Sequence, residues 1–417
     1  MRYKPYPKYK DSGVEWLGDV PEGWEVRRLA SIGNFSKGGG FSKKDLVDKG
    51  LSAILYGDIY TRYNIQIKSI SRYISEETAK NVVKIQKNDL LFTGSGETVE
   101  DIGKSVTYLD SEKIYAGGDV IIFRQTIADS LFLSYALSSN SSIIQKSLIA
   151  KGQIIVHIYA SGLRNILITF PPLKEQTQIA TYLTQKTKKI DTLIEKQQSL
   201  IKLLKEKRQA LVDKALNEDD IKSIRIDKVI NKIYRPVYRD KNKTYTTLGL
   251  YNRGRGLFHR EPKVEDELGE SDFYWVEDGD LILSGQFAWE GAIALAKKDE
   301  NITIVSHRFP IVRGKKNILN TEYLWAFFTT QLGNFILNEH SVGSAGRNRP
   351  LNMNTLVKEK IPLPSMEAQM KVAKVVQIEQ LLHVKINKEI ALLKERRVAL
   401  VSAVVGGKVD VREWEVN

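Results

Sequence analysis

The sequence contains no cysteine and very little histidine. The lack of cysteine excludes a disulfide framework, a thiolate zinc site and a cysteine nucleophile, and it fits a reducing compartment. The histidines do not follow the spacing of metal ligands, so we expect no metal site. They are His157, His259, His307, His340 and His383.

Long apolar runs are also missing. No stretch approaches the roughly 18 consecutive apolar residues that a membrane-spanning helix needs. The start of the sequence, Met1 to Pro7, lacks the apolar core of a secretory signal. We therefore expect a cytoplasmic protein.

The composition is that of ordinary folded domains. The chain has 417 residues, 42% of them hydrophobic and 27% charged, which predicts two or three soluble domains. The formal charge is +13, but it is unevenly spread. Residues 173–217 hold 10 basic against 5 acidic residues, and residues 365–405 hold 7 against 4, so these two segments carry +8 of the surplus. Any binding of nucleic acid by the remaining blocks must rest on local basic loops and not on a uniformly basic face.

An internal repeat organises the chain. Residues 168–183 (ITFPPLKEQTQIATYL) align without gaps with residues 361–376 (IPLPSMEAQMKVAKVV), at an offset of 193. Residues 203–212 (LLKEKRQALV) align with residues 392–401 (LLKERRVALV) at an offset of 189. The difference of four residues is about one helical turn. Two matches in the same order indicate a duplicated segment.

Each repeat predicts a long helix. Residues 173–217 and 365–405 contain neither proline nor glycine, whereas Pro172 and Pro364 stand just before them. A helix of this length, roughly 65 Å, is much longer than one domain core. Its apolar stripe therefore needs another long helix, and the other repeat is the obvious partner. Two separate core helices are the alternative.

The blocks around the helices share a second pattern. Residues 88–94 (NDLLFTG) parallel residues 279–285 (GDLILSG), and each run is followed by a glycine turn and a further short apolar run. Short apolar runs between Gly, Asn and Asp are typical of strands and turns. We expect two α/β domains of one fold with diverged surfaces, each recognising something different.

The glycine-containing motifs do not support an enzyme. Residues 92–96 (FTGSG) have the form of a methyltransferase cofactor loop, but the Asp/Asn/Ser-Pro-Pro-aromatic run that adenine methyltransferases need is missing. Residues 103–105 (GKS) resemble the end of a phosphate loop, yet Thr98 stands where its first glycine belongs. No Gly-x-Ser-x-Gly nucleophile motif occurs. We expect a non-catalytic binding protein; a stand-alone or fused adenine-specific methyltransferase and a coiled-coil scaffold that does not bind DNA are the alternatives.

Several loops combine cations, amides and aromatic rings, the side chains that contact phosphates and base edges. Arginine pairs bidentately with guanine and asparagine with adenine. In the first block the candidates for DNA binding are Lys43, Lys44, Arg62, Tyr63, Lys68, Arg72, Ser95, Lys104, Gln153 and Arg164. In the second block they are Arg253, Arg255, Arg260, Gln286, Trp289, Ser344, Arg347, Asn348 and Arg349.

Two motifs carry a resemblance to a known family. Residues 12–26 (SGVEWLGDVPEGWEV) and residues 171–176 (PPLKEQ) resemble the specificity subunit of type I restriction-modification enzymes, and the resemblance spans the whole chain. The second copy departs from the family pattern, since Ala368 replaces the usual Glu before Gln369.

The resemblance implies an α+β fold. Two α/β target recognition domains would be separated by two long antiparallel helices that form a coiled coil with pseudo-twofold symmetry. Residues 1–172 would be the first recognition domain, 173–217 the central conserved spacer helix, 218–364 the second recognition domain and 365–417 the C-terminal spacer helix and tail. Each recognition domain would read one half of a bipartite DNA target, with the helices setting the gap.

The resemblance also implies partners. Double-stranded DNA, two modification subunits and motor-nuclease restriction subunits are expected, with no membrane. The chain itself would bind no cofactor; its partners would use S-adenosylmethionine, and ATP with Mg²⁺ for restriction. Subunit contacts are expected at the starts of the long helices, at Pro172, Glu175, Gln176, Pro364 and Gln369.

Overall fold

The computed structural model describes residues 4–152, 155–219, 221–297, 302–343 and 349–415. The chain divides into two compact units: unit 1 comprises Met1–Glu195 with Glu389–Asn417, and unit 2 comprises Lys196–Lys388. Along the described residues, no helix is long and apolar enough to cross a membrane.

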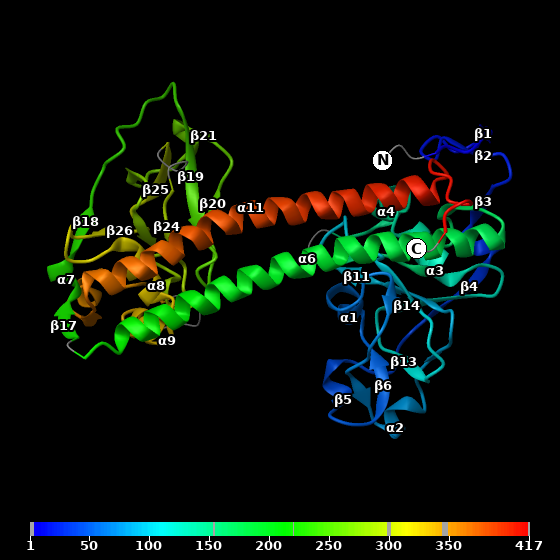
Figure 1. Ribbon diagram of the computed structural model, residues 1–417, viewed down its shortest axis with the longest axis horizontal. Helices are drawn as coiled ribbons and strands as arrows, with labels where there is room; N and C mark the ends of the chain where they lie inside the picture. Colours follow the sequence, from blue (N-terminus) through cyan, green and yellow to red (C-terminus); the bar gives the residue numbers. More distant parts are fainter. Residues whose placement is uncertain (1–3, 153–154, 220, 298–301, 344–348, 416–417) are drawn as a thin grey trace. The chain divides into compact units, whose positions relative to one another are not determined.

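Two long helices, α6 (Leu173–Leu216) and α11 (Met366–Val405), contribute one half to each unit. In unit 1, Ile179 and Leu183 of α6 share a core with Val401 of α11, while Asp191, further along α6, pairs with the earlier Arg397. The two helices therefore run antiparallel there, as Figure 1 shows. The expected long helices that pair with each other are confirmed.

The same pairing is found in unit 2. Val212 near the end of α6 shares a core with Val372 and Val376 near the start of α11. Arg208 and Glu379 join the helices by an ion pair of 2.7 Å. Arg208 and Arg397 are the equivalent arginines of the two sequence repeats, so each unit closes its helix pair with an arginine that reaches a carboxylate on the other helix.

Unit 1 is built on two five-stranded sheets. The first has the order β4 (Gly33–Lys37), β14 (Val120–Gln125), β10 (Leu90–Thr93), β12 (Ser105–Tyr108) and β7 (Gln66–Ile67), with only the β12–β7 pair parallel. The second has the order β5 (Leu46–Val47), β8 (Tyr73–Ile74), β6 (Leu51–Ile54), β13 (Ile114–Ala116) and β9 (Lys84–Ile85). Three two-stranded pairs are β1 (Tyr9–Asp11) with β2 (Asp19–Pro21), β3 (Glu25–Arg28) with β16 (Leu167–Phe170), and β11 (Ser95–Gly96) with β15 (Val156–His157).

Short helices complete unit 1. They are α1 (Tyr56–Thr61), α2 (Glu76–Ala79), α3 (Ser130–Leu137), α4 (Asn140–Ile149) and α5 (Ala160–Leu163), with the 3-10 turns η1 (Leu29–Ser31) and η2 (Lys43–Asp45). The largest core joins the first sheet, α3 and the paired halves of α6 and α11.

Unit 2 has the same plan. One sheet has the order β18 (Ile230–Ile233), β26 (Ile311–Gly314), β23 (Leu281–Leu283) and β24 (Ile293–Leu295). The other has the order β20 (Leu257–His259), β19 (Thr244–Leu250), β25 (Thr303–Ser306) and β22 (Phe273–Trp275), with β21 (Lys263–Val264) also on β19. β17 (Lys222–Arg225) pairs with β27 (Lys360–Leu363). The helices are α7 (Ile226–Val229), α8 (Thr321–Phe328), α9 (Gln331–Glu339) and α10 (Met353–Leu356), with η3 (Glu265–Glu267) and η4 (Ala288–Glu290).

The sequence runs NDLLFTG and GDLILSG take the same conformation in the two units. Asn88 and Gly279 both have positive φ, 72° and 82°, and each precedes a buried aspartate. Asp89 accepts from the Nε and Nη2 atoms of Arg124 at 2.8 and 2.7 Å. Asp280 likewise accepts from Arg313 Nε at 2.6 Å. A buried carboxylate is stable only when it is paired and hydrogen-bonded, which explains why the aspartate and the arginine recur together.

Candidate nucleic-acid interface

Three loops of unit 2 that are far apart in sequence come together around η4. Arg253 N donates to Glu290 O at 2.8 Å, and Gly254 N donates to Gly291 O at 2.7 Å. On the other side, Leu351 N donates to Gly285 O at 2.8 Å. These backbone hydrogen bonds join residues 251–260, 284–291 and 349–351 into one loop cluster. Most of the candidate residues that the sequence predicted in this block lie on it.

The arginine loop has a backbone shape that its hydrogen bonds hold in place. Arg253 has φ 60°, followed by Gly254 at 61° and Gly256 at 100°. A left-handed conformation costs a residue with a side chain roughly 1 kcal/mol. The strand-like contacts to residues 290–291 offset that cost. Asn252 also donates through Nδ2 to the carboxylate of Glu290.

Cations of the loop cluster rest on aromatic rings. The guanidinium of Arg349 lies 5.1 Å from the ring of Trp289, and Arg349 Nε donates to Ser341 O at 3.1 Å. Arg255 lies 5.2 Å from the Tyr251 ring, and Arg260 lies 6.0 Å from Phe258. A guanidinium on a ring keeps its charge while losing rotational freedom, and this prepares it for phosphates and base edges.

Other candidates of unit 2 are placed less tightly. Gln286 is exposed beside the Ser284 turn, where Ser284 Oγ accepts from Phe287 N at 3.0 Å. Ser344, Arg347 and Asn348 lie outside the described residues.

The corresponding region of unit 1 is a short antiparallel pair of strands, β11 and β15. Residues 95–96 pair with residues 156–157, and Ser95 Oγ is 2.9 Å from His157 Nδ1. The ring of Tyr159 stacks near that of His157 with centroids 6.4 Å apart, and Tyr159 is exposed. Gln153 lies outside the described residues. The sequence does not predict His157 and Tyr159 as contacts. The one sequence signal is that Tyr159, an aromatic residue, directly precedes the Ala-Ser-Gly run 160–162.

Two sequence candidates of unit 1 are occupied by internal contacts. Tyr63 is buried, and its hydroxyl donates to Ser69 O at 2.5 Å. Lys104 Nζ donates to Tyr60 O at 3.1 Å, and burial lowers the pKa of Lys104. Both side chains therefore make hydrogen bonds within the fold, and Ser95 is also buried.

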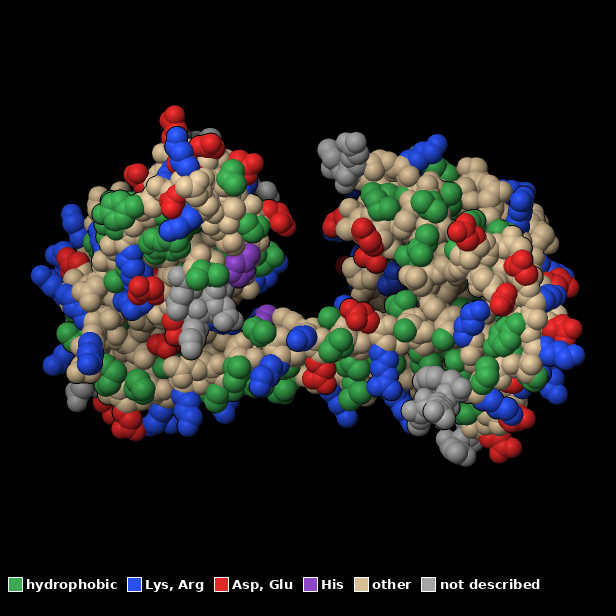
Figure 2. All heavy atoms as spheres, turned by 90° about the horizontal axis from the view of Figure 1, so that it is seen from above, with side chains coloured by type: hydrophobic (Ala, Val, Ile, Leu, Met, Phe, Trp, Pro, Cys, Tyr) green, Lys and Arg blue, Asp and Glu red, His purple; other side chains and the backbone are tan. Residues whose placement is uncertain are grey.

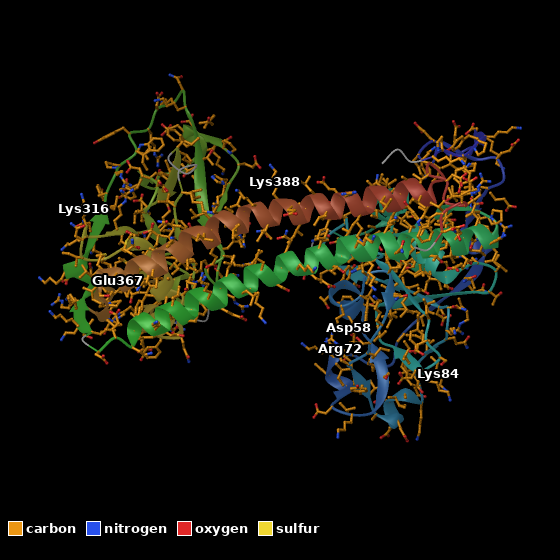
Figure 3. All side chains as sticks on the ribbon, in the orientation of Figure 1. Asp58, Arg72, Lys84, Lys316, Glu367 and Lys388 are labelled. Atoms are coloured by element: carbon orange, nitrogen blue, oxygen red, sulfur yellow. The ribbon has the colours of Figure 1, made fainter. Side chains whose placement is uncertain are left out.

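The remaining predicted DNA-binding cations of unit 1 either contact Asp58 or are exposed. Arg72 Nε donates to Asp58 Oδ1 at 2.7 Å, and Arg62 Nε lies 3.3 Å from the same oxygen. Figure 3 labels Asp58 and Arg72 in unit 1. The other four are exposed, on η2, beside β7 and after α5: Lys43, Lys44, Lys68 and Arg164.

A buried lysine was missed entirely by the sequence analysis. Lys146 of α4 is 3% exposed, and its Nζ donates to Gly103 O at 3.1 Å and to Leu137 O at 2.9 Å. Burial lowers its pKa to about 8. In unit 2 a leucine, Leu337, occupies the position of Lys146. Gly291 is the equivalent of Gly103, and its carbonyl accepts from Gly254 N in place of a lysine. Nothing in the sequence distinguishes this lysine from a solvated one.

The motif at the start of each long helix forms a buried clamp. Gln176 Oε1 accepts from Asp129 N at 2.9 Å while its Nε2 donates to Pro171 O at 2.8 Å. Gln369 repeats this with Asn320 N at 2.8 Å and Pro364 O at 3.0 Å. Both glutamines are almost fully buried, so in this chain they hold the loop before α3 or α8 onto the helix start.

The remaining residues expected at subunit contacts differ in exposure. Pro172 is exposed, whereas Pro364 is buried. Glu175 accepts from the hydroxyl of Tyr6.

Charge of one sign does not dominate either unit. Figure 2 shows Lys and Arg side chains interspersed with Asp and Glu on the visible face of each unit. Across the described ranges, no cluster of three or more His, Asp or Glu side chains has the arrangement to hold a metal ion. The charges that distinguish the loop cluster are therefore the few stacked arginines.

Comparison with known proteins assigns the family. The family described as the type I restriction modification DNA specificity domain matches residues 21–203 and 218–392. The type I restriction enzyme MjaVIII specificity subunit of Methanocaldococcus jannaschii is 25% identical over 420 residues, which cover 94% of this chain and 94% of that protein.

One solved structure supports the fold. A structure described as the basis of complex assembly and conformational transition of the type I R-M system has a TM-score of 0.57 at 16% identity, covering 94% of this chain and 99% of the other. The type I restriction-modification S subunit from M. genitalium has a TM-score of 0.49 at 17% identity, covering 91% and 96%. Because the family matches both units over most of their length, this chain belongs to the type I restriction modification DNA specificity domain family.

Proposed function

We propose that this chain is the DNA specificity subunit of a type I restriction-modification enzyme, and that each unit reads one half of a bipartite DNA target. The observation that carries the proposal is the contrast inside each unit. The buried Asp–Arg pair, the glutamine clamp and the helix pair are the same in both units, whereas the surface loops differ in sequence and shape. A constant scaffold with different loops is what two readers of different base sequences require.

In unit 2 the loop cluster would make the base contacts. Arg349 on Trp289 and Arg255 on Tyr251 present planar guanidiniums, which pair bidentately with the O6 and N7 atoms of guanine. Gln286 would read adenine or hold a phosphate. Arg253 and Arg260 belong to the same proposed surface, and Ser344, Arg347 and Asn348, which lie outside the described residues, stay proposed DNA contacts.

In unit 1 the β11–β15 strand pair around Ser95 and the exposed Tyr159 would face the bases, with the exposed cations holding phosphates. Phosphate contacts position the protein, and base-edge contacts select the sequence. Among the candidates, Lys43, Lys44, Lys68 and Arg164 suit the first role because they are exposed. Arg62 and Arg72 share Asp58, so DNA would have to compete with that carboxylate.

The long helices would bind modification subunits. In unit 2 they leave a set of large apolar side chains exposed, which an isolated helix pair does not need. The set comprises Leu200, Leu203, Ile378, Leu381 and Val384. A partner that contributes apolar helices would cover them. The modification subunits would supply S-adenosylmethionine and the pocket for the flipped adenine, and restriction subunits would add ATP- and Mg²⁺-dependent cleavage.

The chain itself would be non-catalytic. The FTGSG segment, the strongest enzyme-like motif, is closed by hydrogen bonds: Gly94 N donates to Asp119 O at 2.7 Å, and residues 95–96 pair with β15. A Cβ on Gly94 would already lie 3.0 Å from Asp119 O, so this segment leaves no cradle for a cofactor.

Genome-wide mapping of methylated adenines tests the proposal. Cells that express the modification subunit with this chain should methylate one bipartite sequence, and cells without this chain should not. Methylation of the same sites by the modification subunit in cells that lack this chain would contradict the proposal.

A further inference from the structure

The two units share a set of equivalent exposed apolar positions outside the recognition loops. The segments 127–149 and 318–340 align without gaps at an offset of 191, because Asp129 and Asn320 occupy the same N-cap position and each donates its backbone N–H to a clamp glutamine. Their helices bury the same positions: residues 142, 145 and 146 in α4 correspond to residues 333, 336 and 337 in α9.

Within these segments and the helix repeats 203–212 and 392–401, exposed large apolar side chains recur at three equivalent positions. Ile127 and Ile318 are 46% and 42% exposed, Ile144 and Phe335 are 43% and 57% exposed, and Leu392 and Leu203 are 57% and 60% exposed. Other exposed apolar residues of these segments do not recur: Leu148 corresponds to Glu339, and Leu332 corresponds to Ser141.

The recurrence restricts what these side chains contact. The units read different bases, so a residue that serves base recognition has no reason to recur. A residue that holds phosphates is polar or cationic. An exposed isoleucine or phenylalanine also gains nothing for the fold. The remaining role is contact with a protein that meets both units in the same way, in one copy each.

The position of α4 and α9 joins this surface to the long helices. In unit 1, Asn140 N at the start of α4 donates to Ser402 Oγ of α11 at 2.9 Å. In unit 2, a cavity of about 290 Å³ lies between α9 and α6, lined among others by Gln331 and Asn334 on one side and Lys205 and Arg208 on the other. The short helices α4 and α9, which carry Ile144 and Phe335, therefore lie next to a long helix in each unit.

We propose that Ile144 on α4 and Phe335 on α9 are contact residues for the modification subunit, one copy on each unit, next to the recognition loops. This rests on the proposed function. The contact would place the methyltransferase beside the bases that the unit reads, because the loop after α4 carries residues 155–159 and η4 packs against α9. The equivalent Ile127 and Ile318 extend the surface to the clamp.

The test uses the full-length chain mixed with purified modification subunit in analytical ultracentrifugation. Ile144→Glu and Phe335→Glu are each expected to weaken one of two partner sites at least ~10-fold, so that a 1:1 complex replaces the 1:2 complex at concentrations that saturate the wild type. The double variant should bind neither copy tightly. The substituted positions are exposed, so the thermal midpoint should not change.

Two control variants come from the chain itself. Leu148→Glu copies Glu339 of unit 2 onto an even more exposed position of the same helix, and Leu332→Ser copies Ser141 of unit 1. Both should retain two partner sites. A Leu148→Glu variant as weak as Ile144→Glu would show a general surface effect and overturn the assignment, as would full binding by Ile144→Glu.

A third outcome concerns DNA. Loss of DNA affinity by Ile144→Glu without loss of partner binding would make the surface a DNA contact and also overturn the inference. If the wild-type chain binds no modification subunit at all, the proposed function itself fails. The two failures are therefore distinguishable.

Discussion

The ion pair between Arg208 and Glu379 gives the sharpest test of how the helix pair is held in register. Arg208 Nη1 donates to both carboxylate oxygens of Glu379, at 2.8 and 2.7 Å, and the two side chains are only 11% and 7% exposed. The guanidinium also lies 4.8 Å from the ring of Trp325. Arg208→Met removes the cation and leaves the carboxylate largely buried.

The magnitude follows from this burial. Breaking a buried ion pair by removing one partner costs about 3–5 kcal/mol. The cavity beside Arg208 and Glu379 lets water reach the orphaned carboxylate, so we expect the lower end, about 3 kcal/mol. Arg208 Nε has no hydrogen-bond partner within the described part of the chain, so part of the desolvation cost is already present in the native state. The double variant Arg208→Met/Glu379→Leu should therefore recover to within about 1 kcal/mol of the wild type.

Urea unfolding followed by tryptophan fluorescence measures this, because Trp325 stacks against the substituted arginine. The exposed pair Lys371–Glu367 on α11 is the matched control, and Lys371→Met should leave the midpoint unchanged. A loss below about 1 kcal/mol for Arg208→Met, or a double variant no more stable than the single one, would refute the claim that the paired charges hold the register.

Three further predictions concern pH, DNA and the gap. Burial lowers the pKa of Lys146 from 10.5 to about 8, so the folded chain binds fewer protons than the unfolded chain between these two pH values. The buried charge of Lys146 therefore destabilises the fold fully below pH 8, and this destabilisation is relieved as the pH rises. The free energy of unfolding of the wild type relative to Lys146→Leu should rise by about 3 kcal/mol between pH 7 and 10.5 in urea titrations, and a constant difference would contradict the buried charge. Arg349→Ala should lower affinity for the cognate site by about 10-fold and relax one half of the mapped sequence, whereas Lys43→Ala should weaken all DNA alike and reduce the salt slope by about one; equal effects of the two would refute the division of roles. Four residues inserted near Gln197, about one helical turn, should lengthen the gap between the two half-sites by about one base pair in methylation maps, and an unchanged gap would contradict the role of the helices.

Much of the architecture could be predicted from sequence because it depends on repeated patterns. Two long segments without proline or glycine, with matching apolar stripes, predict a helix pair, and α6 and α11 confirm it. The NDLLFTG and GDLILSG runs predict equivalent strands because left-handed turns and buried aspartates leave a local signature.

The candidate site was harder to predict because contacts between loops leave no local signature. The sequence could pick out Arg349 and Trp289 as suitable residue types, but their stacking depends on three segments meeting around η4. Tyr63 and Lys104 are the same residue types turned inward, and only their surroundings distinguish them from exposed contacts. The glutamines of the helix-start motif are predicted partner contacts, and the contact that the sequence does not reveal is the hydrogen bond each accepts from the backbone before α3 or α8.

The most direct test of the central claim exchanges one reading block. Residues 25–165 would be replaced by the equivalent block of another family member, leaving α6, α11 and unit 2 unchanged, and methylated adenines would be mapped across the genome. The account predicts that one half of the bipartite target changes while the other half and the gap are preserved. A change in both halves would contradict the claim that each unit reads its own half-site.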